Sequence, residues 1–586
     1  MKIQFNPDLD YQQEAIDSLV SIFEGQEICR TNFSVPTITG KPTLLPGMGK
    51  LDGVGNKCQL LEDEILENVQ AIQLKNGLPR SEKLDSMNFT VEMETGTGKT
   101  YVYLRTILEF NKRYGFSKFI IVVPSVAIKE GVNKSLEMTQ DHFKGLYDNV
   151  TYDYFVYDSQ KLGQVRSFAS SDDIQIMVIN IDAFRKSFTD PSKETKANII
   201  HRAQDRMSGN KPIDFIRDTH PIVIIDEPQS VDSTKKAKES IAQLNPLCCL
   251  RYSATHRDLY NLMYKLDSID AYERKLVKQI EVASIEVKDG HNKAYVRLLA
   301  VDNKRSPITA QLEFDALKSG KVKRLKKKVR SGDDLLSLSG GRDVYDGYII
   351  NDIHCEEGNE YVDFTSKADI LRLGQAVGNV NQDEYKRLQI RKTIEEHLEK
   401  ELMLRPQGIK VLSLFFIDKV SNYRLYDDDG NPLPSKYATI FEEEYKDLIK
   451  RPKFHTLFEG ADTQSLPSEV HNGYFATDRK HEGRKNTEVN NNAKCEELTY
   501  NLIMKEQEKL LSFDTKLKFI FSHSALKEGW DNPNIFQICT LNETSSVMKK
   551  RQEIGRGLRI AVNQEGERVY GFAVNTLTVM ANESYD

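Results

Sequence analysis

The sequence predicts an α/β fold with two parallel-sheet lobes and a β-rich insertion between them. In two regions, from the N-terminus to about Lys265 and from about Gly408 onward, short apolar strands alternate with helical stretches. This alternation is the pattern of parallel α/β folds. Between these regions, from about Val282 to Asp363, the strands alternate apolar and polar residues and the turns are polar and rich in glycine. We therefore predict three domains, at residues 1–275, 276–375 and 376–586.

Most of the predicted strands are continuous apolar runs, as expected where helices cover both faces of a sheet. In the first lobe they are Phe89–Val91, Phe119–Val123, Ile176–Ile179 and Ile222–Ile225, with a helix at Tyr101–Asn111. In the second lobe they are Val411–Ile417, Lys518–Phe521, Phe536–Thr540 and Val569–Val574, after a helix at Glu384–Leu404. The polar stretch at about 425–495 is predicted to be an irregular insertion in the second lobe.

Composition indicates a soluble globular protein of 586 residues, 39% hydrophobic and 29% charged. No run approaches the roughly 18 apolar residues of a membrane helix, so no membrane partner is expected. The seven cysteines form no Cys-x-x-Cys pair, which favours a cytoplasmic location and argues against a structural zinc site. The net charge of −6 argues against coating nucleic acid by bulk charge, but it is compatible with a local basic groove.

Residues Met93–Thr100 have the composition and setting of a phosphate-binding loop. The glycines let the backbone curl so that its N–H groups face phosphate oxygens, and the following helix offers its positive end. Lys99 would reach the β and γ phosphates, and the Thr100 hydroxyl would ligate Mg²⁺. Met93 departs from the general pattern, which has Gly or Ala there. The predicted cofactors are ATP and Mg²⁺, and the candidate nucleotide-binding residues are Thr95, Gly96, Thr97, Gly98, Lys99 and Thr100.

Asp226 and Glu227 are adjacent carboxylates directly after the strand Ile222–Ile225. Asp226 would hold Mg²⁺ through water, and Glu227 would orient and deprotonate an attacking water. Paired carboxylates after a strand are common on protein surfaces. Their position more than a hundred residues after a phosphate loop favours the catalytic interpretation.

Gln552, Arg556 and Arg559 form a third candidate catalytic group. We predict that they lie on one helix or helix start, where the two arginines, three residues apart, share a face. An arginine stabilises the charge of a transferring phosphoryl group because it stays protonated and presents several N–H donors. A solvated basic helix end is the common alternative. The order along the chain, with the loop and the carboxylates first, favours catalysis.

This set of motifs resembles helicase superfamily 2, and more narrowly the Res subunit of type III restriction enzymes. The stretches that carry the closer match are Met93–Thr100, Asp226–Gln229, Ser253–His256, Ser524–Asn534 and Gln552–Arg559. The resemblance implies two RecA-like lobes with ATP bound between them. It also implies that ATP hydrolysis moves the protein on double-stranded DNA or switches its conformation there. The family's partner is a DNA methyltransferase subunit of the Mod type, which reads the target site.

The resemblance implies further site residues at the matching positions. Tyr11 and Gln12 resemble the adenine-reading motif, since a glutamine amide can pair with both N6 and N7 of adenine. Pro124 and Ser125 resemble a strand-end contact to the nucleic-acid backbone. The remaining implied residues couple ATP to lobe movement (Gln229, Ser253, Thr255 and His256) or line the interlobe cleft (Gly529 and Asp531). For His256, a surface histidine on a loop stays an alternative.

A basic run between Lys318 and Arg330 lies outside the helicase motifs. It includes Lys326, Lys327 and Lys328 and contains no acidic residue. Such a density of charge could clamp a duplex backbone. Lysines also blunt exposed sheet edges, and the sequence leaves both interpretations open.

The family's Res chain continues into a C-terminal nuclease domain with an Asp…(Asp/Glu)-x-Lys site. The triplets Glu286-Val-Lys288 and Asp478-Arg-Lys480 have no convincing upstream acidic partner on a strand. We therefore expect this chain to hydrolyse ATP without cutting DNA.

Two other functions stay open: a stand-alone superfamily 2 DNA or RNA helicase, and a nucleotide-switch scaffold that binds no nucleic acid.

Overall fold

The computed structural model divides into two compact units, the first containing residues 1–283 and 393–580 and the second residues 284–392. The residues that it describes are 2–36, 50–187, 196–207, 209–284, 294–303, 306–318, 321–356, 359–374, 376–377, 382–426, 432–459, 464, 466–475, 502–503, 506–523, 530, 532–542 and 547–581. No helix in this described part combines the length and the apolarity needed to cross a membrane.

The described residues of the first lobe form a seven-stranded sheet in which the strand pairs are parallel. From edge to edge its strands are β5 (Tyr152–Val156), β6 (Ile174–Asn180), β4 (Lys118–Val123), β7 (Ile222–Asp226), β8 (Cys248–Ser253), β3 (Asn88–Met93) and β9 (Leu262–Leu266). The strands predicted in this lobe are confirmed. A hairpin of β1 (Arg30–Pro36) and β2 (Lys50–Asn56) lies outside the sheet.

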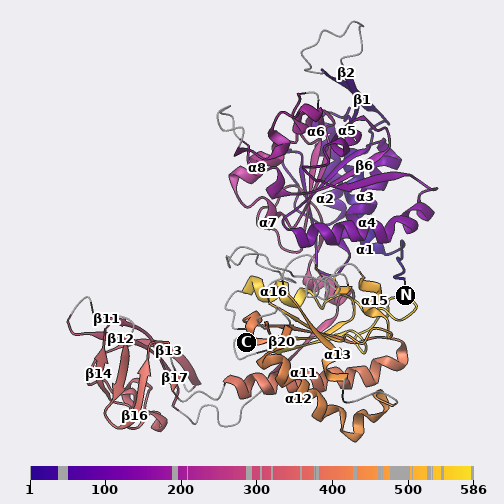
Figure 1. Ribbon diagram of the computed structural model, residues 1–586. Coiled ribbons are helices and arrows are strands. Elements are labelled where there is room, and N and C mark those ends of the chain that lie inside the picture. The colour runs from indigo at the N-terminus through magenta and orange to yellow at the C-terminus, as the bar shows by residue number, and fades with distance from the viewer. Residues whose placement is uncertain are drawn as a thin grey trace. The chain divides into compact units, whose positions relative to one another are not determined.

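Helices cover both faces of this sheet (Figure 1). Alternate residues of β4 belong to two separate apolar clusters, with Phe119 and Ile121 in one and Ile120 and Val122 in the other. This two-sided burial explains why the strand is a continuous apolar run. The helices of the lobe are α1 (Asp10–Val20), α2 (Glu62–Lys75), α3 (Lys99–Tyr114), α4 (Val126–Leu146), α5 (Gly163–Ser170), α6 (Pro212–Asp218), α7 (Pro228–Val231), α8 (Lys235–Ala242) and α9 (Ser268–Glu273).

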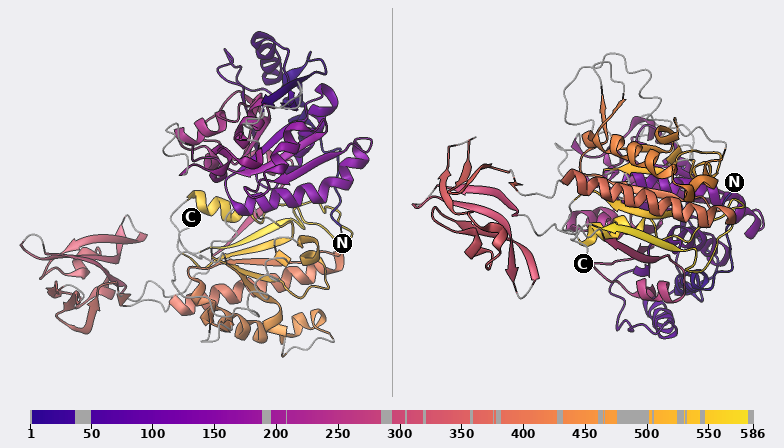
Figure 2. Two further views of the ribbon diagram at one scale, coloured as in Figure 1. Left: turned by 45° about the horizontal axis from the view of Figure 1, so that its top comes forward. Right: turned by 90° about the horizontal axis from the view of Figure 1, so that it is seen from below.

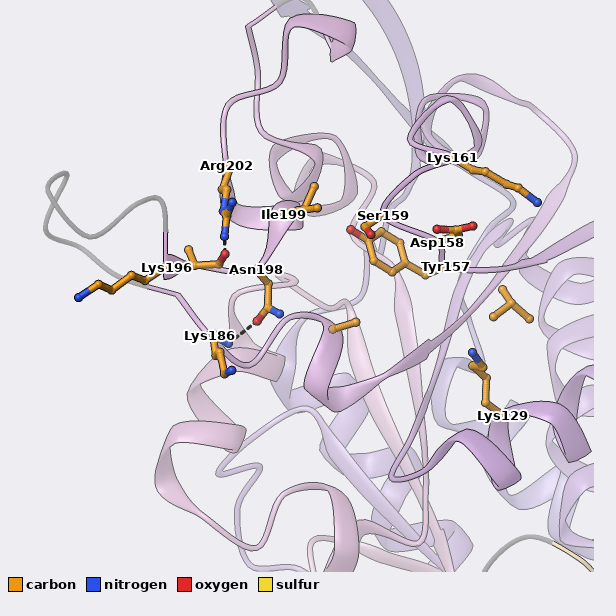
Figure 3. Close-up of a pocket in the computed structure, with 13 residues that line it drawn as sticks. Lys129, Tyr157, Asp158, Ser159, Lys161, Lys186, Lys196, Asn198, Ile199 and Arg202 are labelled. Carbon is orange, nitrogen blue, oxygen red and sulfur yellow. Dashed lines mark hydrogen bonds between the residues drawn. The ribbon is translucent and has the colours of Figure 1, made fainter. Parts of the chain in front are cut away.

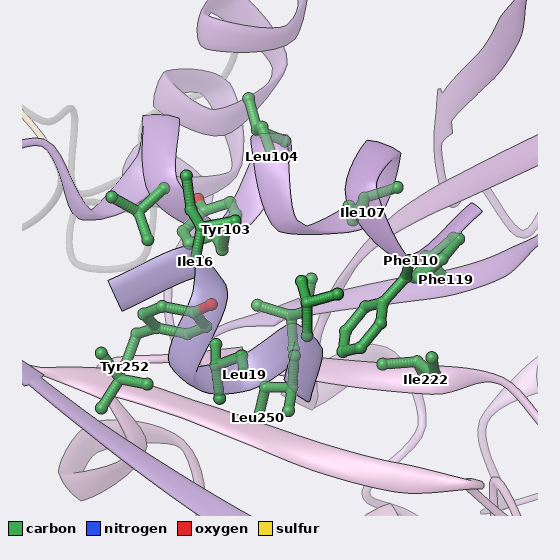
Figure 4. Close-up of a cluster of buried hydrophobic side chains, with 14 of the residues drawn as sticks. Ile16, Leu19, Tyr103, Leu104, Ile107, Phe110, Phe119, Ile222, Leu250 and Tyr252 are labelled. Carbon is green, nitrogen blue, oxygen red and sulfur yellow. The ribbon is translucent and has the colours of Figure 1, made fainter. Parts of the chain in front are cut away.

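Helix α3, which begins inside the predicted phosphate loop, is fixed by the larger apolar cluster. Its side chains Tyr103 and Ile107 lie with Leu19 of α1 and Tyr252 of β8 in this cluster (Figure 4). The helix begins after Gly98 and ends before Gly115, and both glycines have left-handed backbone conformations. Burial of this face therefore holds the start of α3 at the C-terminal ends of β3, β7 and β8.

The second lobe contains a sheet that the described residues build from six strands. Their order is β10 (Gln279–Ser284), β24 (Thr576–Ala581), β23 (Ile535–Thr540), β18 (Leu412–Phe416), β22 (Phe519–Ser522) and β21 (His471–Tyr474). Its other described elements are α11 (Gln382–Leu404), α12 (Lys436–Ile449), α13 (Leu466–Glu469), α15 (Gln507–Leu511), α16 (Val547–Gly555) and the strand pair β19 (Arg424–Tyr426) and β20 (Pro432–Pro434).

Helices α11 and α12 lie on one face of the second sheet (Figure 2). His397 of α11 bonds the Ser413 hydroxyl of β18 at 2.8 Å, and Phe441 of α12 packs edge-on against Phe415 of the same strand. Ser413 and Phe415 share a face because side chains alternate along a strand. The predicted helix and the first three predicted strands of this lobe are confirmed.

Two predictions for the second lobe are wrong. Val569–Val574 is not a strand: Gly571 has a φ of +97°, and the Asn575 side chain donates to the carbonyls of Val569 and Gly571. These contacts fold the apolar run into a turn, and the strand follows it as β24. The stretch at 425–495 is not wholly irregular, because α12 and the edge strand β21 lie within it.

The second unit is the predicted β-rich insertion. One sheet contains β13 (Lys321–Val329), β12 (Thr309–Lys318), β11 (Val296–Asp302) and β17 (Ala376–Val377), and the other β14 (Ile350–His354), β15 (Tyr361–Phe364) and β16 (Lys367–Arg372). The short helix α10 (Leu335–Leu338) packs with them. Strand β10, which the boundary at residue 276 assigned to this insertion, instead joins the sheet of the second lobe.

Candidate nucleotide-binding site and nucleic-acid interface

The predicted phosphate loop connects the end of β3 at Met93 to the start of α3 at Lys99. Gly96 and Gly98 have φ values of +89° and +98°, a backbone region that favours glycine. The Thr97 hydroxyl donates to the Glu94 carbonyl at 2.7 Å and closes the loop on itself. The loop therefore has the strand, turn and helix order that phosphate binding requires.

Tyr11 and Gln12 of α1 contact this loop directly. The Tyr11 hydroxyl and the Gln12 amide nitrogen both donate to the Thr97 carbonyl, at 2.9 and 3.0 Å. A Cβ atom at Gly98 would lie 2.5 Å from that amide nitrogen, so the close approach of Gln12 requires glycine there. The structure thus brings Tyr11 and Gln12 to the loop, and their reading of adenine stays a prediction.

The Lys99 side chain reaches across to the predicted catalytic carboxylate. Its Nζ lies 2.5 Å from Oε1 of Glu227, which follows β7 with a φ of +54°. This strained backbone is fixed by the Glu227 N–H, which donates to the Tyr252 carbonyl of β8 at 3.0 Å. Two residues 128 positions apart in the chain therefore form an ion pair at the phosphate loop.

The ion pair keeps both groups charged despite their partial burial. Burial by itself raises the pKa of Glu227, but the Lys99 ammonium outweighs it and holds this pKa at about 2. Burial disfavours the charged form of Lys99, and the carboxylates of Glu227 and Asp226 outweigh that effect and raise its pKa. Both side chains are ionised at neutral pH.

A pH dependence of stability follows from the Glu227 pKa. The pKa is lowered from the ordinary 4.5 to about 2 in the folded protein. Its contribution to stability is therefore complete above pH 4.5 and is lost as the pH falls to about 2. We expect the free energy of unfolding to fall more steeply across this window in the wild type than in Glu227→Gln. Denaturant titrations at several pH values measure this, and parallel curves would contradict it.

Two of the predicted coupling residues bind Glu227 directly, and a third binds one of these two. Gln229 and Ser253 donate to its Oε2 atom at 2.6 and 2.7 Å, and the Thr255 N–H donates to the Ser253 hydroxyl at 3.0 Å. His256 instead contacts the Val91 carbonyl of β3 with its Nε2 at 2.9 Å, and burial lowers its pKa. His256 is therefore partly buried against β3 and is not a free surface histidine.

Asp226 and Thr100 provide oxygen atoms suited to Mg²⁺. Asp226 is buried at the end of β7, and Thr100 lies in the first turn of α3. Both residues lie close to the Tyr103 hydroxyl, which donates to Asp226 at 3.4 Å. Burial and Asp226 raise the pKa of Tyr103 well above its usual range, and a hydrogen bond with Thr100 offsets part of this increase. The described residues contain no cluster of three or more His, Cys, Asp or Glu for a metal. Magnesium commonly needs only one or two protein ligands beside phosphate and water, so this pair fits it.

The position predicted for the two arginines is wrong. Helix α16 ends at Gly555, so Gln552 lies on the helix, exposed, whereas Arg556 and Arg559 follow it in a loop. A Cβ atom at Gly557 would lie 2.6 Å from the Leu577 side chain, and this close packing requires glycine just beyond the helix end. The Arg556 guanidinium donates to the Trp530 carbonyl at 2.9 Å.

The arginine loop, residues 555–559, lies against the phosphate loop. A Cβ atom at Gly96 would lie 3.2 Å from the Arg559 amide nitrogen, and one at Gly555 would lie 3.1 Å from Cγ2 of Thr95. The structure therefore brings together the arginine loop, the phosphate loop and Glu227. Gly529 and Asp531 lie outside the described residues.

The sequence matches one family model and several curated proteins. Residues 7–258 match the family model "Type III restriction enzyme, res subunit". The chain is 31% identical over 580 residues to the EcoP15I Res subunit of Escherichia coli, an alignment that covers 95% of this chain and 55% of the relative. It is 29% identical over 617 residues to the EcoPI Res subunit of Escherichia phage P1, covering 96% and 55%. The chain is therefore similar in sequence to type III Res subunits over most of its length.

The chain spans about half the length of the curated relatives it matches. Among solved structures, it is similar to the helicase Lhr of Mycobacterium smegmatis bound to single-stranded DNA and AMP-PNP. That alignment has a TM-score of 0.38 and 10% identity, and it covers 84% of this chain and 43% of the other. The fold assignment rests on the two parallel sheets described above.

The first lobe has a basic pocket beside the predicted nucleic-acid contact at Pro124 and Ser125. These two residues follow β4, and the Ser125 hydroxyl accepts the Ile128 N–H at 3.3 Å and caps α4. A cavity of about 680 Å³ lies where α4 begins and β5 and β6 end (Figure 3). Its lining includes one acidic residue, Asp158, and the cations Lys129, Lys161, Lys186, Lys196 and Arg202.

Sequence reasoning missed this pocket because its cations are scattered between residues 129 and 202. The available signal was that several polar residues follow the C-terminal ends of two predicted parallel strands, an edge where ligands commonly bind. Those strand ends meet only when the sheet has formed.

The basic run predicted as a second nucleic-acid contact forms β13, an edge strand of the second unit. Lys326 pairs with Glu313 at 3.8 Å, and Lys328 pairs with Asp302 at 3.3 Å. Acidic residues of β12 and β11 thus neutralise part of the charge. These contacts favour the sheet-edge interpretation for Lys326, Lys327 and Lys328, and their binding to DNA stays a prediction.

Proposed function

We propose that this chain is the ATP-hydrolysing motor part of a type III restriction enzyme. Hydrolysis would move the chain on double-stranded DNA or switch its conformation there. One observation carries the proposal: the arginine loop and the Lys99–Glu227 pair both lie at the phosphate loop. A site for phosphoryl transfer needs a cation for the phosphates, a base for the water and an arginine for the developing charge. These three groups come from separate parts of the chain.

The Lys99–Glu227 pair suggests how ATP would activate the base. Paired with Lys99, Glu227 is a weak base, because its pKa is about 2. The phosphates of ATP would compete for the Lys99 ammonium, and the pKa of Glu227 would then rise. Glu227 could accept a proton from water as the water oxygen bonds to the γ phosphorus and the bond to the leaving ADP oxygen breaks.

The other site residues would orient this reaction. Ser253 and Gln229 donate to Oε2 of the Glu227 carboxylate, whereas Lys99 contacts Oε1. Asp226 and Thr100 would hold Mg²⁺, which neutralises phosphate charge when it is bound. Arg556 and Arg559 would contribute positive charge to the transferring phosphoryl group.

We also propose that duplex DNA binds at the Ser125 cap and the basic pocket, and that a Mod-type methyltransferase subunit supplies sequence recognition. The cap and the pocket share the start of α4, where backbone N–H groups and lysines suit phosphate oxygens.

The test of the proposed function is ATP turnover by the purified chain, measured without nucleic acid and with duplex DNA or RNA. We expect stimulation by duplex DNA. Stimulation by RNA alone would indicate another helicase, and ATP binding without turnover would indicate a switch scaffold.

Neutralising the pocket should weaken DNA binding and reduce its salt dependence. The variant is Lys129→Gln, Lys161→Gln and Lys186→Gln together, since none of these lysines pairs with a carboxylate of the described residues. We expect the slope of log affinity against log salt to shrink by about 1 unit per lost phosphate contact.

The matched control for the pocket variant removes three lysines from β13: Lys326→Gln, Lys327→Gln and Lys328→Gln. Both variants change the net charge equally, so a general charge effect would alter both slopes. If only the β13 variant lowers the slope, DNA binds the second unit and the pocket proposal is wrong.

A further inference from the structure

Lys278 is a buried lysine in the segment that joins α9 of the first lobe to β10 of the second sheet. Its side chain is almost completely covered, with 1% of the residue exposed. The ammonium donates to three backbone carbonyls: that of Pro533 at 2.6 Å, that of Gly557 at 3.1 Å and that of Arg559. Three acceptors match the three N–H donors of an ammonium group.

Two of these carbonyls belong to the arginine loop. The backbone N–H of Lys278 also donates to the Leu558 carbonyl at 2.9 Å. Consecutive carbonyls of residues 557–559 are thus all bound by one residue, 279 positions from Gly557 in the chain. On another side, the loop touches the phosphate loop at Thr95 and Gly96. Lys278 therefore restrains the loop that touches the phosphate-binding residues.

Packing alone does not account for a lysine at this position. Burial and the nearby cations Lys400 and Arg559 lower the pKa of Lys278 well below its usual range. Within the described residues, its ammonium forms no ion pair with a carboxylate. An apolar side chain would avoid this unfavourable burial, but it could not bind three carbonyls. The specific consequence of the lysine is the fixed backbone of the arginine loop.

We propose that Lys278 is a positioning residue that holds the arginine loop, residues 555–559, in its place beside the phosphate loop. This inference rests on the proposed ATP hydrolysis. Lys278 does not touch the substrate in this arrangement and acts through Arg556 and Arg559. Because a displacement of about 1 Å at a reacting group can reduce turnover about a hundredfold, a loosened loop would slow the chemical step.

The test is the kcat and KM for ATP of Lys278→Met, a variant of similar length without N–H donors. We expect kcat to fall about 10- to 100-fold, with KM changed less than threefold, since the arginines act on charge that develops in the transition state. In an Arg559→Ala, Arg556→Ala background, Lys278→Met should cause little further loss, because residues that act through one another are not additive.

The matched control is Lys400→Met. Lys400 is a partly buried lysine that donates to the same sheet, to the Thr576 carbonyl at 2.6 Å and the Thr578 hydroxyl at 2.8 Å. Within the described residues, none of its hydrogen bonds goes to the arginine loop. We expect it to lower the melting temperature while kcat stays near the wild-type value. Equal losses of kcat in both variants, or a full additional loss in the arginine-free background, would show a purely structural role and overturn the proposal.

Two further outcomes separate this inference from the function on which it rests. If the wild-type chain hydrolyses ATP and folded Lys278→Met retains its kcat, the inference fails and the function stands. If the wild-type chain has no turnover under any nucleic-acid condition, the proposed function fails.

Should Lys278→Met not fold, Lys278→Gln replaces it. An amide has two N–H donors for three carbonyls, so we expect a severalfold loss of kcat, and wild-type kcat would overturn the proposal.

Discussion

Replacing Lys99 by alanine should abolish ATP hydrolysis, with a loss of about 10²- to 10³-fold or more. The ammonium of Lys99 already lies among carboxylates at the phosphate loop, 2.5 Å from Glu227. In the proposed reaction it would move its charge to the phosphates, and alanine supplies no charge there. Phosphate release by the purified variant, with and without duplex DNA, measures the effect. Normal turnover would show that this loop does not bind the reacting nucleotide.

Stability needs its own control in this experiment, because Lys99→Ala leaves the partly buried Glu227 carboxylate without its cation. Breaking a fully buried pair by removing one partner typically costs about 3–5 kcal/mol. This pair is only partly buried, with side chains 12% and 27% exposed, and Ser253 and Gln229 still donate to Glu227, so we expect a smaller loss. The double variant Lys99→Ala, Glu227→Gln removes both charges. We expect it to recover part of the lost unfolding free energy and none of the turnover. Recovered turnover would show that Lys99 acts through stability alone.

Glu227→Gln should bind ATP and lose turnover by about 10²- to 10⁴-fold. An amide of the same shape can hold a water but cannot accept its proton at neutral pH. Removal of the negative charge also frees Lys99 for the phosphates, so we expect nucleotide affinity to be equal to or greater than that of the wild type. Fluorescent-nucleotide binding and phosphate release, measured on the same preparation, distinguish the two effects.

Ser253→Ala is the matched control for Glu227→Gln. It removes one donor to the carboxylate, at 2.7 Å, and keeps the base itself. We expect an intermediate loss of turnover with unchanged nucleotide affinity. If binding and turnover fell together in Glu227→Gln, Glu227 would have a structural or metal-holding role instead of that of a base.

Much of the fold could be predicted because its strongest signals are local. Strand β4 is an unbroken apolar run because helices cover it on both faces, and α3 follows a phosphate loop whose residues are contiguous. The predictions that were wrong depended on distant contacts. The run Val569–Val574 turns because Asn575 binds its backbone, and α16 stops where Gly557 packs on Leu577.

Local sequence specifies which chemical groups this chain has and the backbone that presents the first of them. Glycines at 96 and 98 and the lysine that follows define a phosphate loop within a few residues. The pairing of the charges depends on the folded arrangement, because the partners are far apart in the chain. Lys99 meets Glu227 across 128 residues, Lys278 binds the arginine loop across 279, and scattered lysines form one pocket. The physical reason is that the energy of a charge depends on burial and on its nearest partners, and these exist only after the sheets have formed.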